Sequence, residues 1–313
     1  MRTVQVTRFG DPDVLQVREA PDPSPGAGEV QIAVEVVEVL FLDTQLRAGW
    51  GEDLFPMRPP WVPGTGVAGT IRAVGEGVDP RREGARVVAR TGNEGAYAEL
   101  VAVAAEEAID IPAGLDPAVA TAALHDAVLA LDRLERAGMG ASSRVLITGA
   151  AGSLGQWFIP LAKPAGARVV GTAGGTAKTD AVRALGADEA LDYHEPGWAD
   201  AAEEPFDVVF DGVGGEIGRA ALRLTKDGGV FFGHGAASGD FAAAEPERGI
   251  TMIGVEAQID DQTWRRHLRS GLDLLAAGAV KPIIGQRVPL SRAAQAHEAM
   301  ARRTVIGKTE LTL

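Results

Sequence analysis

The segment from Arg144 to Gly155 constrains this chain most, because a short β-branched run is followed there by regularly spaced glycines. The apolar run 145–148 stops at a turn with glycines at positions 149, 152 and 155, and a helical pattern follows. Such a strand, loop and helix N-terminus aims unpaired backbone N–H groups and the positive end of a helix dipole at one point, where a diphosphate can bind. The segment therefore predicts a nucleotide-binding site.

The glycine spacing alone is weak support, because the chain has 40 glycines and such a turn can serve only to pack a helix on a strand. The context is stronger. Three further apolar runs, 167–172, 207–211 and 229–233, follow with helical segments between them. Strands that alternate with helices indicate a parallel sheet with helices on both faces.

Bulk properties exclude several classes of function. A length of 313 residues allows two domains with ample core. The formal charge of −13 repels nucleic acid, and the short basic pair 81–82 and triplet 265–267 are interpreted as solvated surface. The start of the sequence has no apolar signal core, and no apolar run reaches about 18 residues, so we expect no membrane span. With no cysteine in the chain, these features predict a cytoplasmic protein.

The character of the chain changes near residue 115. Before it, short β segments such as 31–36 and 64–75 alternate with turns rich in proline and glycine, which predicts a compact, irregular barrel. After it come a helix over 117–134 and the alternating strands and helices. The end of the chain predicts helices at 266–277 and 291–303 and a strand at 308–313. We therefore expect one domain from 1–114 and 262–313, and a second domain from 115–261.

The helix expected after the glycine loop, 153–165, contains a conflict. Pro160 and Pro164 both lie within it, and Pro160 falls in its interior. An interior proline removes a hydrogen bond and clashes with the preceding turn, at a cost of roughly 3 kcal/mol. The sequence therefore predicts a bend at Pro160.

Several stretches taken together resemble one protein family. They are residues 39–49 with Asp43 and Arg47, 63–78, 95–99, 145–155, 185–188 with Tyr193, 211–215, 235–239 and 307–308. In this order and spacing the chain resembles the zinc-independent, zeta-crystallin-like quinone oxidoreductase branch of the medium-chain dehydrogenase/reductase superfamily. The resemblance spans nearly the whole length. It implies an α/β protein with a GroES-like, β-rich catalytic domain, an inserted Rossmann domain with a doubly wound parallel sheet, and a homodimer.

The sequence predicts no metal. The zinc alcohol dehydrogenases of the same superfamily need a cysteine ligand and a Gly-His-Glu stretch, and this chain has neither. Its five histidines show no paired metal-ligand spacing; they are His125, His194, His234, His267 and His297.

The cofactor is expected to be NADPH rather than NADH. Rossmann domains that prefer NAD usually place a carboxylate at the end of the second strand, and residues 170–175 contain none. Lys178 and Tyr193 follow, and the resemblance implies that these two residues contact the 2′-phosphate. The alternative is that Lys178 is an ordinary surface residue of a helix. The residues expected to hold the cofactor are Gly152, Ser153, Leu154, Gly155, Thr172, Ala173, Gly174, Lys178, Tyr193, Val213, Gly235, Ala236, Ala237 and Lys308.

Hydride transfer to a quinone or a conjugated carbonyl compound needs mainly correct placement of donor and acceptor, so the sequence need not show a catalytic dyad. The expected catalytic residues are Phe41, Asp43, His125 and Asp126, and further pocket candidates are Gln45, Trp50 and His234. Asp126 with His125 could donate and accept protons in the reaction, or the pair could simply be a polar helix start with satisfied hydrogen bonds. Phe41 and Trp50 could equally be core.

The substrate stays open at the sequence level. Members of the family commonly have asparagine, tyrosine and threonine where this chain has Leu40, Gln45 and Asp126. Reduction of a quinone is the first hypothesis, and reduction of an enoyl or 2-alkenal double bond is the second. The third is an NADPH-binding protein that senses the cofactor without turning it over.

Overall fold

The computed structural model describes residues 1–202, 204–242 and 248–313, and the chain divides into two compact units. The first unit consists of Met1–His125, Leu268–Gly278 and Ile283–Leu313, and the second of Asp126–His267 and Ala279–Pro282. The domain boundaries expected after residues 114 and 261 stay a prediction, because compactness alone does not establish which segments fold independently.

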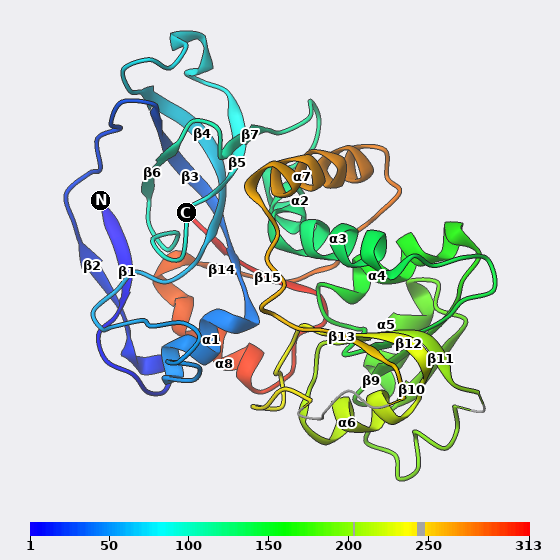
Figure 1. Ribbon diagram of the computed structural model, residues 1–313. Coiled ribbons are helices and arrows are strands. Elements are labelled where there is room, and N and C mark those ends of the chain that lie inside the picture. The colour runs from blue at the N-terminus through cyan, green and yellow to red at the C-terminus, as the bar shows by residue number, and fades with distance from the viewer. Residues whose placement is uncertain (203, 243–247) are drawn as a thin grey trace. The chain divides into compact units, whose positions relative to one another are not determined.

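The second unit is built on a parallel sheet with the strand order β10-β9-β8-β11-β12-β13 (Figure 1). Its strands are β8 (Arg144–Thr148), β9 (Arg168–Ala173), β10 (Glu189–Asp192), β11 (Phe206–Asp211), β12 (Thr225–Gly233) and β13 (Thr251–Ile253). The chain steps outward from β8 to β9 and β10, then returns beside β8 and continues the other way. This reversal confirms the doubly wound Rossmann sheet, which binds ligands at the carboxyl ends of its strands.

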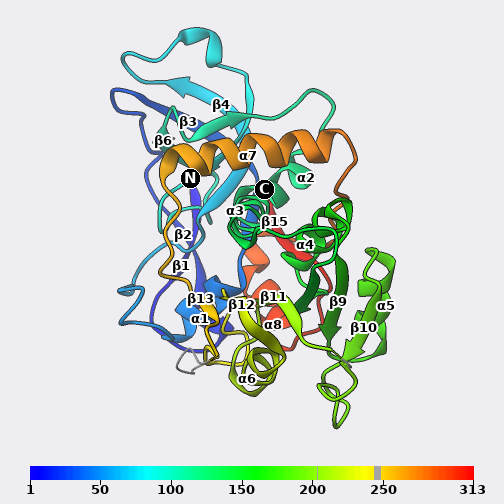
Figure 2. The same ribbon diagram turned by 45° about the vertical axis from the view of Figure 1, so that its right-hand side comes forward.

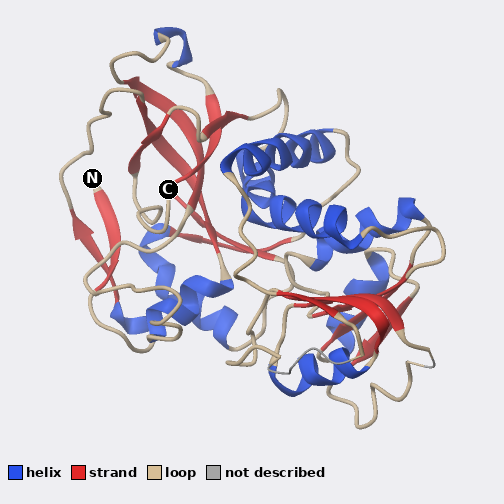
Figure 3. Ribbon diagram, viewed as in Figure 1, coloured by secondary structure: helices blue, strands red, loops and turns tan. Residues whose placement is uncertain are grey.

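Helices lie on both faces of this sheet (Figure 3). They are α3 (Val128–Ala137), α4 (Gly155–Ala162), α5 (Thr176–Ala184) and α6 (Gly215–Arg223), and α7 (Asp261–Ala276) follows the sheet in the chain. Right-handed crossovers place α4 and α6 on opposite faces, because the chain steps in opposite directions after β8 and after β11. Figures 1 and 2 both show α5 beside β9 and β10. Under the helices the sheet is apolar, and Phe158 of α4 stacks on Phe210 of β11 with ring centroids 4.1 Å apart.

The helix after the glycine loop is shorter than expected. α4 begins at Gly155, ends at Ala162 and continues as a 3-10 turn, Lys163–Ala165. Pro160 lies inside α4, where it has no N–H to donate toward the carbonyl of Gln156. The helix therefore ends within one turn of its proline.

The first unit is built on a sheet with the order β14-β15-β3-β4-β5-β7, in which β6 also pairs with β3. The strands are β3 (Glu29–Val39), β4 (Gly66–Val74), β5 (Arg86–Arg90), β6 (Leu100–Ala104), β7 (Ala108–Asp110), β14 (Ile284–Pro289) and β15 (Lys308–Thr312), and β1 (Arg2–Val6) pairs separately with β2 (Leu15–Glu19). β3 is long enough to pair along one edge with both β6 and β15, while β4 covers the other. The C-terminal strand thus lies inside the sheet, between β14 and β3.

The helices α1 (Phe41–Ala48), α2 (Pro117–Ala122) and α8 (Ala293–Ala301) belong to this unit, as does α7 from Leu268 onward. The helix expected over 117–134 is present, but it is not α-helical throughout. A π-helical turn, Ala123–Ala127, separates α2 from α3. Such turns add one residue to a helix and recur at functional sites, and this one carries both His125 and Asp126.

Within the described parts of the chain, no helix combines the length and the apolar character that crossing a membrane requires.

Candidate active site

The glycine loop has the expected form of strand, turn and helix N-terminus. Gly149, directly after β8, has a φ of 64°, in the left-handed region that favours glycine. A Cβ on Gly155 would lie 2.0 Å from the carbonyl oxygen of Ala150, so only glycine lets α4 approach the loop this closely. A Cβ on Gly152 would lie 3.2 Å from the carbonyl oxygen of Gly149. The loop therefore delivers the first N–H groups of α4 to the carboxyl edge of the sheet, where an anion can bind.

A buried carboxylate stabilises the turns at this edge of the sheet. Asp211, at the end of β11, accepts hydrogen bonds from the hydroxyl of Thr148 and from the N–H groups of Val213 and Gly214, each of the latter at 3.1 Å. Burial raises the pKa of Asp211, while these hydrogen bonds oppose the rise. The sequence analysis did not single out Asp211, although an acid at the end of an apolar strand, directly before a glycine-rich turn, was a usable signal.

The turn after β12 joins the turn after β11. The N–H of Gly235 donates to the carbonyl of Asp211 at 3.1 Å, and the N–H of Ser238 donates to the carbonyl of Val213 at 2.8 Å. The structure thus gathers most of the predicted cofactor residues at one edge of one sheet, namely Gly152, Ser153, Leu154, Gly155, Val213, Gly235, Ala236 and Ala237.

The end of β9 holds the second group of predicted cofactor residues. The hydroxyl of Thr172 is buried and has no hydrogen-bond partner among the described residues. A Cβ on Gly174 would lie 2.5 Å from the ring of His194 and 2.9 Å from the ring of Tyr193, so both rings pack directly on this backbone. Ala173 ends β9, and Lys178 stands in the first turn of α5 immediately after it.

The sequence analysis missed a carboxylate at this place. Asp192, at the end of β10, pairs in register with Ala173 and accepts hydrogen bonds from the N–H groups of Gly175, at 3.0 Å, and His194, at 2.9 Å. These bonds lower its pKa. Strand β9 ends without a carboxylate, as expected. The neighbouring strand β10 supplies Asp192 at this place, and its carboxylate caps the N-terminus of α5.

His234 follows β12 and is a buried neutral base. Burial lowers its pKa to about 4, and Arg133 acts in the same direction. Its Nδ1 has no hydrogen-bond partner among the described residues, and its ring lies 5.6 Å from that of Phe158. The imidazole is therefore unprotonated at neutral pH.

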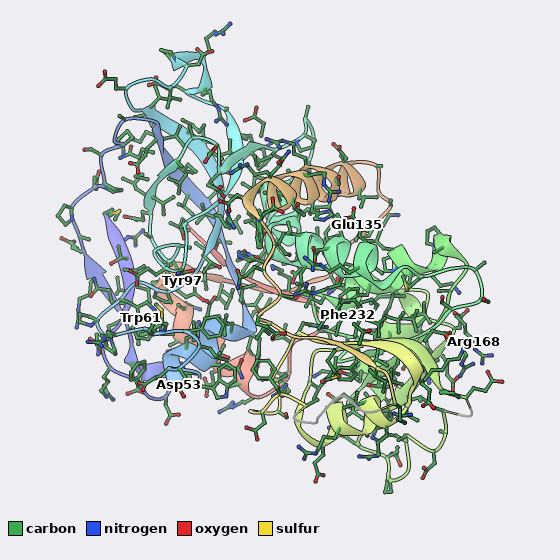
Figure 4. The ribbon with its side chains drawn as sticks, viewed as in Figure 1. Asp53, Trp61, Tyr97, Glu135, Arg168 and Phe232 are labelled. Carbon is green, nitrogen blue, oxygen red and sulfur yellow. The ribbon has the colours of Figure 1, made fainter. Side chains whose placement is uncertain are left out.

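In the first unit, Asp43 lies in a buried polar network on α1. Its carboxylate accepts from the N–H of Leu40 at 2.9 Å and from the hydroxyl of Tyr97 at 3.3 Å. Tyr97 also lies 2.9 Å from Nε2 of His297 on α8, and Figure 4 labels Tyr97 in this region. Burial raises the pKa of Asp43 to about 7, and burial with the nearby Arg47 lowers the pKa of His297 to about 3. Asp43 is thus part of the packed interior of its unit.

The other predicted residues of α1 lie nearer the surface. Phe41 begins α1 and is half-buried, and the guanidinium of Arg303 lies 4.8 Å from the centre of its ring. Arg303 has a φ of 58°, which is uncommon for a residue other than glycine. Gln45 and Trp50 are half-buried, and the N–H of Trp50 donates to the carbonyl of Gln45 at 3.0 Å.

His125 and Asp126 are neighbours in the chain but have different partners. Asp126 accepts a hydrogen bond from the hydroxyl of Ser153 at 2.9 Å, in the glycine loop of its own unit. His125 pairs through Nδ1 with the carboxylate of Glu38, on β3. The two side chains therefore bind different partners, and their use as acid and base stays a prediction.

Lys308, which we expected to bind the cofactor, forms a charged cluster with Glu38 and His125. Its Nζ donates to Oε2 of Glu38 at 2.7 Å, and its side chain is only 2% exposed. The sequence analysis missed Glu38, although a charged residue inside an apolar strand needs a buried partner.

Among the residues that the structure describes, no group of three or more His, Cys, Asp or Glu side chains is placed to hold a metal ion. The expectation of a metal-free site stays a prediction.

Sequence and structure comparisons give the family. Residues 26–113 match the family described as alcohol dehydrogenase GroES-like domain, and residues 185–309 match the one described as zinc-binding dehydrogenase. The chain is 31% identical to a 2-haloacrylate reductase from a Burkholderia species, over 98% of this chain and 97% of that protein. It is also 31% identical to the quinone oxidoreductase of Rattus norvegicus, over 95% of this chain and 93% of that protein.

Among solved structures, a mycobacterial protein in complex with NADPH superimposes with a TM-score of 0.90 at 29% identity, over 100% of both chains. Full-length similarity of this kind covers both the GroES-like unit and the Rossmann unit. The chain belongs to the quinone oxidoreductase branch of the medium-chain dehydrogenase/reductase superfamily.

Proposed function

We propose that this protein is an NADPH-dependent oxidoreductase that transfers hydride, without a metal, to a quinone or a similar conjugated carbonyl acceptor. The observation that carries the proposal is the edge of the parallel sheet, where the glycine loop and the turns after β9, β11 and β12 come together. The relatives named as quinone oxidoreductases and the related structure that holds NADPH support the same assignment.

The residues at this edge fit a dinucleotide. Gly155 leaves room for a diphosphate over the N-terminus of α4, because any side chain there would displace the loop. At the other end, the unpaired hydroxyl of Thr172 and the ring of Tyr193 are suited to a ribose, and Lys178 adds a positive charge for a 2′-phosphate. Asp192 adds a negative charge nearby, but two N–H groups already bind it.

When bound, NADPH supplies the hydride from C4 of its nicotinamide. The chain contributes placement, which accounts for most of the acceleration of such a step. We assign the acceptor side to Phe41, Asp43, His125 and Asp126. Asp43 acts there by fixing the start of α1 through the N–H of Leu40, and so by placing Phe41.

Kinetics with both cofactors test the cofactor assignment. Lys178→Ala should raise the KM for NADPH about tenfold and leave the KM for NADH unchanged, because only NADPH carries the 2′-phosphate. The matched control is Lys226→Ala, which removes the same charge from the same unit at a residue paired with Asp207. Equal KM values for the two cofactors in the parent protein, unaltered in both variants, would refute the preference.

Acceptor profiling tests the reaction. NADPH oxidation should be measured with p-quinones, 2-alkenals and enoyl thioesters. The relative named as a 2-haloacrylate reductase favours reduction of a conjugated double bond as the second candidate function. Tight NADPH binding with no turnover of any acceptor would favour a cofactor-sensing protein instead.

Three further properties belong to this proposal. We infer a homodimer, a cytoplasmic location and a small-molecule partner. Sedimentation at several concentrations tests the dimer, and elemental analysis of the purified protein tests the absence of a metal.

A further inference from the structure

The last residue of β10 places a carboxylate beside the end of β9. The two strands are parallel neighbours, and Asp192 pairs in register with Ala173, which ends β9 (Figure 2). Neighbouring strands of a sheet lie about 4.8 Å apart. Rossmann domains that prefer NAD usually have a carboxylate at the end of the second strand. This chain therefore has its carboxylate one strand further along the same edge of the sheet.

Two backbone N–H groups hold this carboxylate in place. Its Oδ2 accepts from the N–H of Gly175 at 3.0 Å, and its Oδ1 accepts from the N–H of His194 at 2.9 Å. Both bonds favour the ionised form and lower the pKa of Asp192, so the group is negatively charged at neutral pH. Each oxygen of a carboxylate has two lone pairs, so each keeps one for a further donor.

The charge of Asp192 has no lysine or arginine partner in the part of the chain that the structure describes. An imidazole nitrogen of His194 lies 3.9 Å from Oδ1. Two other aspartates of the same unit differ, because Asp188 and Asp207 each bind the Nζ of a lysine, at 2.6 Å and 2.9 Å. Asp192 is also the least exposed of the three, at 20% against 35% and 32%. Of these three carboxylates, it is the one that no lysine balances.

Groups that suit an adenosine ribose surround the same turn. The hydroxyl of Thr172 is buried and lacks a hydrogen-bond partner among the described residues. A Cβ on Gly174 would lie 2.5 Å from the ring of His194 and 2.9 Å from the ring of Tyr193, and the two rings meet edge to face with centroids 5.1 Å apart. Lys178 follows in the first turn of α5. The turn that binds the ribose in this fold thus carries both a lysine and an unbalanced carboxylate.

We propose that Asp192 limits the preference of this protein for NADPH over NADH. Its charge repels the 2′-phosphate that Lys178 attracts, whereas its remaining lone pairs accept a hydrogen bond from the 2′-hydroxyl of NADH. Water reduces the repulsion between two such charges without abolishing it. The inference rests on the assignment of NADPH as the cofactor and deepens it, because it predicts that NADH is also bound.

The central test is the binding of NADP⁺ and NAD⁺ to Asp192→Asn, measured by isothermal titration calorimetry without an acceptor. Asparagine keeps an oxygen that accepts from an N–H group at a helix start, so the variant loses the charge and keeps the support of the turn. The Kd for NADP⁺ should fall about fivefold, and the Kd for NAD⁺ should rise about twofold, because an amide oxygen is the weaker acceptor. The ratio of the two values should thus move about tenfold toward NADP⁺.

Salt separates an effect of charge from an effect of structure. The screening length is about 30 Å at about 0.01 M salt and about 3 Å at about 1 M salt. The fall in the Kd for NADP⁺ caused by Asp192→Asn should therefore be largest at low salt and shrink below about twofold at high salt. A change in the shape of the turn would instead persist at both concentrations.

Asp188→Asn is the matched control. It removes the same charge from the residue before β10, at the other end of that strand, where the carboxylate accepts from the N–H of Val169 at 2.7 Å. Both Kd values should change less than about twofold in this control. Asp192→Ala removes the support of Gly175 together with the charge, so it should weaken both cofactors and still move the ratio toward NADP⁺. Thermal melts establish that each variant is folded.

The outcomes separate this inference from the proposed function. A ratio of Kd values that stays the same in Asp192→Asn and in Asp192→Ala overturns the inference and leaves the proposed function standing. A change of equal size at both salt concentrations also overturns it, since it indicates that the carboxylate only supports the turn. A parent protein that binds neither NADP⁺ nor NAD⁺ overturns the proposed function and the inference together.

Discussion

Buried ionisable side chains of the first unit are held by residues far away in the sequence. Asp43 reaches Tyr97, and Tyr97 reaches His297, 200 residues further along the chain. Each of these groups has a protonation state that folding changes, because burial disfavours charge. Their contributions to stability must therefore depend on pH, each with its own sign.

Asp43 has the clearest effect. Burial raises its pKa from 3.8 to about 7, so the folded chain keeps a proton that the unfolded chain has released. Between those two pH values the folded state binds more protons, and the free energy of unfolding falls as pH rises. His297 acts oppositely, because burial lowers its pKa from 6.5 to about 3 and the folded state then binds fewer protons between these values.

Asp43→Asn should remove the first of these contributions. The amide resembles the protonated acid but cannot ionise, so the variant does not lose stability through this pH range. Relative to the parent, its free energy of unfolding should rise by roughly 3 kcal/mol between about pH 4 and about pH 8. Urea denaturation at a series of pH values measures the difference. A difference that does not change with pH would show that the proton is not on Asp43.

At the scale of single elements, the loop between β8 and α4 depends on glycine in two unequal ways. Gly155 has no room for a side chain, since its Cβ would lie 2.0 Å from the Ala150 carbonyl oxygen. Gly152 has a Cβ position 3.2 Å from the nearest atom, a contact that a small shift relieves. Glycine is therefore required at position 155 because α4 approaches the loop closely there, and not because the glycines are regularly spaced.

We expect Gly155→Ala to displace the start of α4. The free energy of unfolding should fall by about 2 kcal/mol, and NADPH binding should weaken more than tenfold, because the N–H groups leave the diphosphate. Gly152→Ala is the matched control and should change stability by less than about 1 kcal/mol. Thermal melts and cofactor titration measure both effects, and equal losses in the two variants would contradict this account.

A second prediction concerns the proline of α4. Pro160→Ala should raise the free energy of unfolding by about 2 kcal/mol, because alanine restores an N–H for the carbonyl of Gln156 and suits a helix. Chemical denaturation measures the change. If the variant is less stable, the ring of Pro160 contributes packing that outweighs the lost hydrogen bond.

These elements also show what the sequence could reveal. Strands β8, β9, β11 and β12 and the glycine turn follow from local patterns, so they were predicted within a few residues, whereas β10 and β13 were not predicted. The π-helical turn was missed, because the phase shift of one added residue is hard to detect in a segment this short and this rich in alanine. The pairs of Glu38 with Lys308 and of Asp192 with Gly175 depend on strand register, which a single sequence does not encode locally.

At the scale of the whole molecule, the two ends of the chain build one unit. β15 lies between β14 and β3. It also supplies Lys308, which pairs with Glu38, and Glu310, which binds Thr121 of α2 and Arg287 of β14. Contacts over such long sequence separations are slow to form during folding. The first unit should therefore depend strongly on its last strand.

Removal of residues 308–313 should abolish the cooperative folding of the first unit. The sheet loses an interior strand, and Glu38 keeps a buried charge without its lysine, which costs several kcal/mol (roughly 3 to 5). Removal of Leu313 alone is the control, since that residue follows β15 and is 42% exposed. Circular dichroism melts of the two truncations measure the effect, and a cooperative melt for the longer truncation would contradict it.

The separation of 270 residues between Glu38 and Lys308 also has a consequence for protein synthesis. A ribosome makes β3 long before β15, so the growing chain carries an acidic residue, Glu38, whose counter-charge does not yet exist. Until β15 emerges, that carboxylate is better hydrated than enclosed, and the edge of β3 that pairs with β15 stays open. The sheet of the first unit can therefore be completed only after β15 has been made, even though its longest strand, β3, is made long before.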